Sequence, residues 1–168
     1  GLTHTEIPST FYSFLRPDQW GAEYAVDVGF GTGEELRLLG YTVDSRRDNG
    51  YRLIAYLQPA QQGFPGAEVL VAMLDTDGEL YNHRGFPALA WIRPSDWASG
   101  DVLRFDSGYI GLLPKQAFEL GIWIIGYPPI RVHPSEAQAA NTRLWRSADG
   151  QQLSLRTFDP VDPELYRD

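Results

Sequence analysis

Short apolar runs separated by turn residues recur along this chain, and this pattern constrains its fold more than any other feature. The predicted strands span residues 36–43, 51–57, 68–74, 79–83, 101–110, 119–127, 142–145 and 153–157. Asn49-Gly50 between the first two runs is a strong hairpin signal, because both residue types tolerate positive φ. Helical signals are confined to residues 134–140. The pattern predicts an all-β fold: an antiparallel β-sandwich, Ig-like or jelly-roll-like, with at most one short helix.

The domain organisation follows from the same pattern. Residues 1–21 mix prolines with polar and scattered aromatic side chains, which predicts an irregular lead-in or linker. Residues 22–168 are expected to form a single β-sandwich domain, since 168 residues lie within the usual size of one domain. The chain has no cysteine, but 43% of its residues are hydrophobic, which is enough to build a core without disulfides.

The strand predicted near residues 118–127 is apolar on both faces. One face carries Phe118, Leu120, Ile122 and Ile124, and the other carries Trp123, Ile125 and Tyr127. A strand of this kind is usually covered on both sides. The segment at residues 84–100 is a candidate cover for the outer face.

The charge of the chain excludes some partners. Its net charge is −8 with a pI near 4.8, and it has no basic run, so nucleic acid is not an expected partner. The acidity also disfavours electrostatic docking on anionic lipid. No apolar run approaches the ~20 residues of a membrane span. The chain begins with Gly1 rather than Met, which favours a fragment or a processed protein.

Acidic residues after the third predicted strand allow two interpretations. Asp75, Asp77 and Glu79 resemble the opening of a calcium-binding loop. An EF-type loop also needs flanking helices, which the pattern does not predict, whereas Asp-Gly suits a tight turn after a strand. The turn is favoured, no cofactor is expected, and calcium is the alternative. A glycoside hydrolase using Asp75 and Asp77, or Asp96, is a further alternative, since that chemistry needs two carboxyl groups about 5–9 Å apart.

Aromatic residues provide the ligand-binding candidates. Trp91, Trp97 and Tyr81, with Asn82 nearby, lie in or beside the segment at residues 84–100. Rings of this kind can stack on sugar faces while an amide bonds the hydroxyls. The alternative, which the sequence favours, is that these rings close the open edges of the sandwich core.

The order of the motifs resembles a known family of domains. The motifs are Phe30-Gly31, Leu36 to Tyr41 (L-x-L-L-G-Y), Leu74-Asp75-x-Asp77-Gly78, Ser95-x-Trp97, Gly100-Asp101-Val102, Leu120-x-Ile122-x-Ile124-x-Gly126-Tyr127 and Thr142-Arg143-Leu144. In this order they resemble the extracytoplasmic C-terminal β-sandwich of bacterial membrane proteins related to dolichyl-phosphate-mannose-type (GT-C) glycosyltransferases. The resemblance covers about residues 28–158 and departs from the pattern at residues 115–119, which lack an expected Pro-Gly.

The resemblance implies a non-catalytic accessory domain. Such a domain would lie outside the cytoplasmic membrane, tethered to the membrane portion of the same parent protein, and would help to position a glycan or an acceptor. In these proteins the catalytic carboxylates belong to the membrane portion, so no catalytic residue is expected in this chain. An independent carbohydrate-binding module is the main alternative, and a hydrolase is the third.

Overall fold

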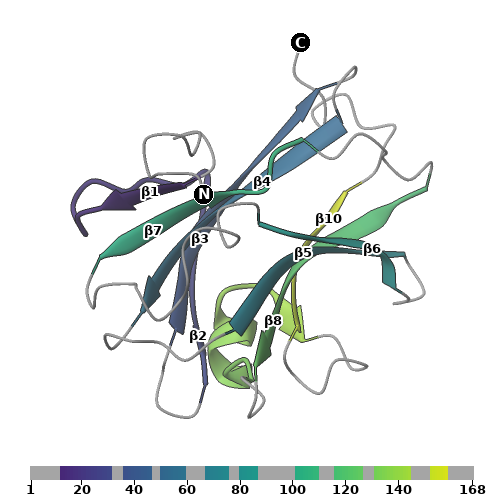
Figure 1. Cartoon of the computed structure of the whole chain (residues 1–168). Coiled ribbons are helices and arrows are strands. Elements are labelled where there is room, and N and C mark those ends of the chain that lie inside the picture. Colours follow the sequence, from purple (N-terminus) through teal and green to yellow (C-terminus); the bar gives the residue numbers. More distant parts are fainter. Residues whose placement is uncertain are drawn as a thin grey trace.

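The alternating runs of the sequence form two antiparallel sheets in the computed structural model (Figure 1). The structure describes residues 12–31, 36–46, 50–59, 67–75, 80–86, 101–109, 116–126, 131–144 and 152–158. Within these residues every strand pairing is antiparallel, and one short helix is present. The prediction of an antiparallel β-sandwich with at most one short helix is therefore confirmed for the described part of the chain.

Within the described residues, sheet A contains five strands. Their order across the sheet is β1 (Tyr12–Leu15), β7 (Val102–Asp106), β4 (Gly50–Pro59), β3 (Leu36–Arg46) and β2 (Tyr24–Phe30). The predicted hairpin forms its centre, because β3 and β4 pair from Leu36 opposite Pro59 to Arg46 opposite Gly50. Gly50 has a φ of 85°, a conformation in which a Cβ would be strained.

Sheet B also contains five strands in the part of the chain that the structure describes. Their order is β6 (Leu80–Gly85), β5 (Ala67–Asp75), β8 (Phe118–Gly126), β10 (Gln152–Phe158) and β9 (Arg143–Leu144). The central strand β8 pairs with β5 on one side and with β10 on the other. Sheet B therefore joins segments from the middle and the end of the chain, with neighbours that are not consecutive in sequence.

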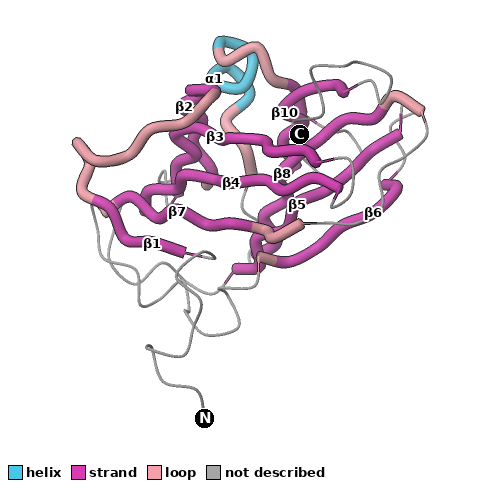
Figure 2. The backbone as a smooth tube through the Cα atoms, turned by 90° about the horizontal axis from the view of Figure 1, so that it is seen from above, coloured by secondary structure: helices cyan, strands magenta, loops and turns pink. Residues whose placement is uncertain are grey.

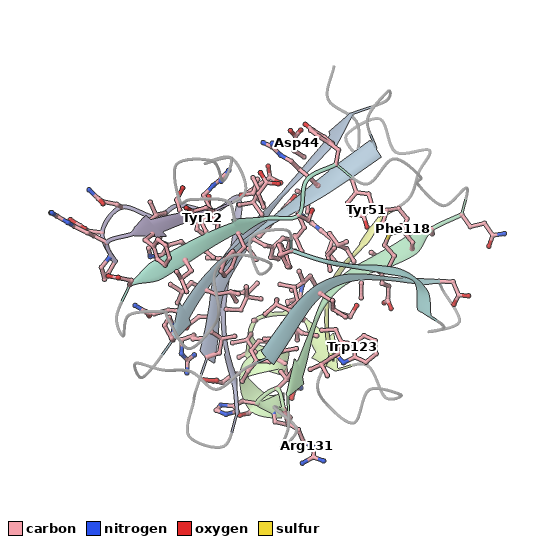
Figure 3. The ribbon with its side chains drawn as sticks, in the orientation of Figure 1. Tyr12, Asp44, Tyr51, Phe118, Trp123 and Arg131 are labelled. Carbon is pink, nitrogen blue, oxygen red and sulfur yellow. The ribbon has the colours of Figure 1, made fainter. Side chains whose placement is uncertain are left out.

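The core lies between the two sheets and follows the alternation of each strand. On β4 the inward residues are Tyr51, Leu53, Ala55 and Leu57, and on β8 they are Phe118, Leu120, Ile122 and Ile124, all of which are buried. The rings of Tyr51 and Phe118 meet across the sandwich, with centroids 6.2 Å apart (Figure 3). This contact links the central strand of sheet A to the central strand of sheet B.

A second apolar cluster covers the outer face of sheet A. It comprises Ile54, Tyr56 and Val102 with the partly buried Leu15, Trp20, Ala22 and Leu39. The centroids of the Trp20 and Tyr56 rings are 5.8 Å apart. The segment that follows β1 therefore packs on the outer face of sheet A through Trp20 and Ala22.

The structure departs here from the irregular lead-in expected for residues 1–21. Residues 12–15 form strand β1, which pairs with β7 from Tyr12 opposite Phe105 to Leu15 opposite Val102. The four residues are too few for alternation to stand out in the sequence beside two nearby prolines. Pairing with β7 and burial of Leu15 supply the stabilisation that local propensity does not.

Glycine allows a close approach at the edge of sheet A. A Cβ on Gly40 would lie 2.6 Å from the Tyr24 carbonyl oxygen and 2.8 Å from the Ala22 Cβ. The pairing register of β2 with β3 shifts beside this position, between Ala25 and Val28, and Asp27 within this bulge has a φ of 58°. The bulge interrupts the period-2 alternation of β2 and therefore weakens its strand signal in the sequence.

The prediction that β8 is apolar on both faces agrees with the burial of its described side chains. Its inward residues are fully buried, and the outward Trp123 and Ile125 are half-buried. The outward Glu119 is also buried, with 7% of its surface exposed. The expected cover at residues 84–100 lies outside the described residues beyond Phe86.

The single described helix, α1 (Pro134–Ala139), lies at one end of the sandwich beside β2 (Figure 2). Proline at its start suits the first turn, where a backbone N–H would have no helical partner. Ala137 is its buried residue, and the preceding Val132 forms an isolated β-bridge with Phe30. The helix is thereby fixed to the edge of sheet A, close to the start of β9 in sheet B.

Candidate functional site

An open cleft of about 360 Å³ lies where the end of α1 meets strands β8 and β10. It is lined by Glu119, Asn141, Thr142, Ser154, Leu155, Arg156 and Thr157. Its lining residues are mostly polar and include one with a carboxylate, one with an amide and three with hydroxyls. The volume lies within the range of about 300–1,000 Å³ that small-molecule sites occupy.

The pairing of β8 with β10 places two polar groups in the cleft. Glu119 lies opposite Thr157, and Ser154 lies opposite Gly121, which brings no side chain to this face. Between Ser154 and Arg156 the register shifts by a β-bulge. Bulges re-aim side chains at the point where pairing is interrupted. Glu119 and Ser154 are buried, with 7% and 4% of their surfaces exposed, whereas Thr157 is exposed.

The end of α1 supplies the opposite rim of the cleft. The Thr142 hydroxyl donates to the Ala137 carbonyl oxygen at 2.7 Å, and the Thr142 backbone N–H donates to the same oxygen at 3.0 Å. Asn141 has a φ of 58°, a left-handed conformation that asparagine adopts at helix ends more readily than most residues. The position of this rim therefore depends on the position of α1.

The Arg156 side chain lies against an aromatic ring of sheet A. The centre of its guanidinium lies 4.2 Å from the centroid of the Tyr24 ring, a cation–π contact. Tyr24 stacks in turn on Tyr41, with centroids 5.0 Å apart. Burial raises the pKa of Tyr41 to about 12, although the nearby Arg156 opposes this shift. Both phenols are therefore neutral at physiological pH.

An ion-pair cluster fixes α1 to sheet A and so sets the rim of the cleft. The Glu136 Oε1 atom accepts a hydrogen bond from the Gly29 backbone N–H at 2.9 Å. Its Oε2 atom accepts from both terminal nitrogens of Arg37, each at 3.3 Å. Arg37 also pairs with Asp27 of the bulge, at 3.0 Å. One carboxylate of the helix thus binds two strands of sheet A.

The pKa of Glu136 reflects these contacts. Partial burial of the carboxyl raises its pKa, but the Gly29 N–H and the Arg37 guanidinium outweigh that effect, with a further contribution from His133. The pKa of Glu136 therefore lies below its ordinary value, because hydrogen bonds to the charged form favour ionisation. The cluster is a charged anchor at neutral pH.

His133 ties the residue before α1 to β2. Its Nδ1 atom lies 3.1 Å from Glu136 Oε1, and its Nε2 atom contacts the Gly31 carbonyl oxygen. Its backbone N–H donates to the Gly29 carbonyl oxygen at 2.9 Å. A Cβ on Gly29 would lie 2.8 Å from Glu136 Oε1, so the missing side chain makes room for the anchor. This gives Gly29 a packing role, while Gly31 has a φ of 96°, a conformation that glycine adopts readily.

A second charged cluster lies on the outer face of sheet A. The buried Asp106 carboxylate is 3.5 Å from Arg52 and 3.8 Å from Arg104, and it accepts a hydrogen bond from the Gly108 N–H at 2.8 Å. The Asp44 carboxylate accepts from the Tyr109 hydroxyl at 2.6 Å and is 3.7 Å from Arg52.

Among the described residues of this second cluster, the carboxylates of Asp44 and Asp106 pair with the guanidiniums of Arg52 and Arg104. Asp44 lies at one end of sheet A, as Figure 3 shows, well away from Trp123 on sheet B. The mutual pairing of the charges and the burial of Asp106 indicate a structural network.

The structure leaves most of the predicted site residues undescribed. Trp91, Trp97, Asp77 and Glu79 lie outside the described residues, as does Asp96. Tyr81 and Asn82 belong to strand β6, but their side chains are not described. Asp75 ends β5, is half-buried and lies opposite Phe118. The sugar-stacking and calcium hypotheses for these residues therefore stay predictions.

The residues of the cleft were not identified as a site by the sequence. The available signal was a polar residue inside an apolar strand, as with Glu119 in β8 and Ser154 in β10. Such residues are ordinary on an outward face unless the fold brings them together. Here the fold joins residue 119 to residues 141–142 and 154–157.

Among the residues that the structure describes, no three histidine, cysteine or acidic side chains gather where they could hold a metal ion. The described helix is not long or apolar enough to cross a membrane. A scan against protein-family models finds no match, and searches among curated proteins and solved structures find none either. The geometry of the cleft is thus the remaining basis for an assignment of function.

Proposed function

We propose that this chain is a non-catalytic domain that binds a glycan or another hydroxyl-rich ligand in the β8–β10 cleft. The observation that carries the proposal is the grouping of a buried carboxylate with an amide and three hydroxyls in one open cleft. Carboxylate, amide and hydroxyl groups together can both accept hydrogen bonds from sugar hydroxyls and donate hydrogen bonds to them.

The burial of two lining residues favours a ligand that enters the cleft and reaches its buried side chains. Glu119 and Ser154 are more than nine-tenths buried, yet both line the cleft. A ligand hydroxyl that reaches them replaces water in a partly desolvated site, where hydrogen bonds to a charged acceptor are strong. Asn141 and Thr142 lie on the more exposed rim and would bond the outer hydroxyls.

The chemistry of the lining favours binding over hydrolysis. Among the described lining residues, Glu119 is the single carboxylate, whereas glycoside hydrolysis needs a pair about 5–9 Å apart. Binding without turnover also fits the accessory role implied by the family resemblance. We therefore extend the proposal to an extracytoplasmic domain that presents a glycan or acceptor to the membrane portion of its parent protein.

Titration calorimetry with a panel of glycans tests the proposal. We expect binding at micromolar to millimolar strength, weakened by at least about tenfold in Glu119→Gln, because a charged hydrogen bond contributes about 1.5–3 kcal/mol. Asp18→Asn removes the same charge from an exposed turn outside the cleft and should leave the affinity unchanged. A flat response across the panel, or equal loss in both variants, would refute the proposal.

A further inference from the structure

His133, the residue before α1, has both of its ring nitrogens against oxygen atoms. Its Nδ1 atom is 3.1 Å from Glu136 Oε1, and its Nε2 atom contacts the Gly31 carbonyl oxygen. A carboxylate and a carbonyl oxygen can only accept hydrogen bonds, and a neutral imidazole carries a single N–H. A neutral ring therefore leaves one nitrogen lone pair facing an oxygen, whereas the protonated ring donates to both oxygens.

The charges around the ring favour its protonated form. Three side chains converge above Gly29, where a Cβ would lie 2.8 Å from Glu136 Oε1, 3.0 Å from His133 Nδ1 and 3.2 Å from an Arg37 nitrogen. Arg37 also pairs with Asp27, at 3.0 Å. Among these described side chains two carboxylates therefore face one guanidinium, and a proton on His133 balances the charges of the cluster.

The effects that oppose this proton are weaker. Arg37 is a like charge beside the ring, but it is already paired with both carboxylates. The positive end of the helix dipole also lies at His133, but α1 has only six residues, so its dipole is small. Arg131 is exposed, where solvent and salt screen its charge. The side chain of Arg143, on the neighbouring strand β9, lies outside the described residues.

We propose that a proton on His133 locks α1 to the edge of sheet A and that the lock weakens as this proton is lost at higher pH. Imidazole side chains ordinarily titrate at about pH 6.5. Because the protonated ring makes one more hydrogen bond in the fold than the neutral ring can, its contribution to stability is present at acid pH and is lost as the pH rises. The end of α1 positions Thr142 at the rim of the cleft, so the same proton acts on the rim. The lock needs no ligand and is independent of the proposed function.

The test compares the melting temperatures of the unmodified chain and of His133→Gln between pH 5.5 and pH 8.5. Glutamine can still form a hydrogen bond but gains no charge in this range. At pH 5.5 we expect His133→Gln to melt at least about 3 °C lower, because a charged hydrogen bond is lost, and at pH 8.5 the difference should fall below about 1 °C. In a Glu136→Gln background the same substitution should lose at least about half of this pH dependence, because the ring no longer faces a charged partner.

A second measurement uses the unmodified chain. Long-range ¹H–¹⁵N NMR at pH 5.5 should show both ring N–H groups of His133, assigned through nuclear Overhauser contacts to Gly29, because hydrogen-bonded N–H groups exchange slowly with water. One of the two should disappear by pH 8.5. A melting-temperature difference that is equal at pH 5.5 and pH 8.5, a pH dependence that is unchanged in the Glu136→Gln background, or a single ring N–H at pH 5.5 would each overturn the lock. If His133→Gln does not fold, the two NMR spectra decide.

Discussion

The contact between Tyr51 and Phe118 allows the packing of the two sheets to be tested, because the interaction energy of the two rings can be measured. The two residues lie on opposite sheets, expose 2% and 1% of their surfaces, and have ring centroids 6.2 Å apart at an interplanar angle of 45°. Aromatic pairs at this separation contribute about 0.5–1.5 kcal/mol beyond the area that they bury. A double-mutant cycle with Tyr51→Leu and Phe118→Leu isolates that contribution.

Each single substitution should destabilise the protein by about 0.5–3 kcal/mol, the usual range for point variants. The double variant should lose about 1 kcal/mol less than the sum, because the pair interaction is lost only once. Urea unfolding followed by tryptophan fluorescence can measure a difference of this size. If the free energy of unfolding falls by about 2 kcal/mol per molar urea, a change of about 1 kcal/mol shifts the unfolding midpoint by about 0.5 M. A matched cycle with Phe14→Leu and Phe118→Leu should be additive, because Phe14 is 47% exposed on edge strand β1. Additivity of the Tyr51 and Phe118 substitutions would refute the packing of the sheets described above.

Three further predictions concern the edge of sheet A. Gly40→Ala should lower the free energy of unfolding, measured with urea, by about 1–3 kcal/mol, because its Cβ would meet the backbone of Tyr24. In the control Gly21→Ala the new Cβ meets nothing within 4 Å, so stability should change by less than about 0.5 kcal/mol. Equal effects of the two substitutions would contradict the close approach at Gly40. Glu136→Gln should lower the melting temperature at pH 7, because the ionised carboxylate stabilises the fold. The difference in melting temperature should shrink as the pH falls below 4.5, the ordinary pKa of the carboxyl group, since a group with a lowered pKa stabilises the fold only while it is ionised. A difference that does not depend on pH would contradict this explanation. Alkaline absorbance titration should show a tyrosine that ionises near pH 12, and this ionisation should be absent in Tyr41→Phe. Because burial favours the neutral phenol, the stability of the fold should decline between about pH 10 and 12. Ionisation of every tyrosine in the folded protein by pH 11 would refute the raised pKa of Tyr41.

The strands that could be predicted from sequence are those with long apolar runs. Strands β3, β4, β5 and β8 each follow an alternating or continuous apolar pattern bounded by turn residues, and the structure confirms them. The helix at residues 134–139 was also indicated, by a proline followed by alanine-rich sequence. Local pattern was sufficient in these cases because propensity and burial agree.

The strands that the sequence did not reveal depend on tertiary contacts. Strand β1 is four residues long and exists through its pairing with β7. Strand β2 contains a bulge at which Asp27 takes a positive φ, and this breaks the alternation that marks a strand. A period-2 pattern cannot report a strand whose register shifts within it.

The candidate site could not be predicted from the sequence for a related reason. Its residues come from β8, the end of α1 and β10, and no local motif links position 119 to positions 141 or 156. The predicted aromatic candidates, Trp91 and Trp97, lie outside the described residues and stay a separate hypothesis. Sequence shows which polar residues interrupt a strand, but only the fold shows which of them share a cleft.

The most direct test of the binding function is a ¹H–¹⁵N NMR titration of the whole chain with the glycan that binds most tightly in the calorimetric panel. We expect chemical-shift changes that saturate and that concentrate at Glu119, Asn141, Thr142 and residues 154–157. Saturating changes confined to residues 81–100, with none at these positions, would contradict binding in the cleft and assign it to the segment that contains Trp91 and Trp97.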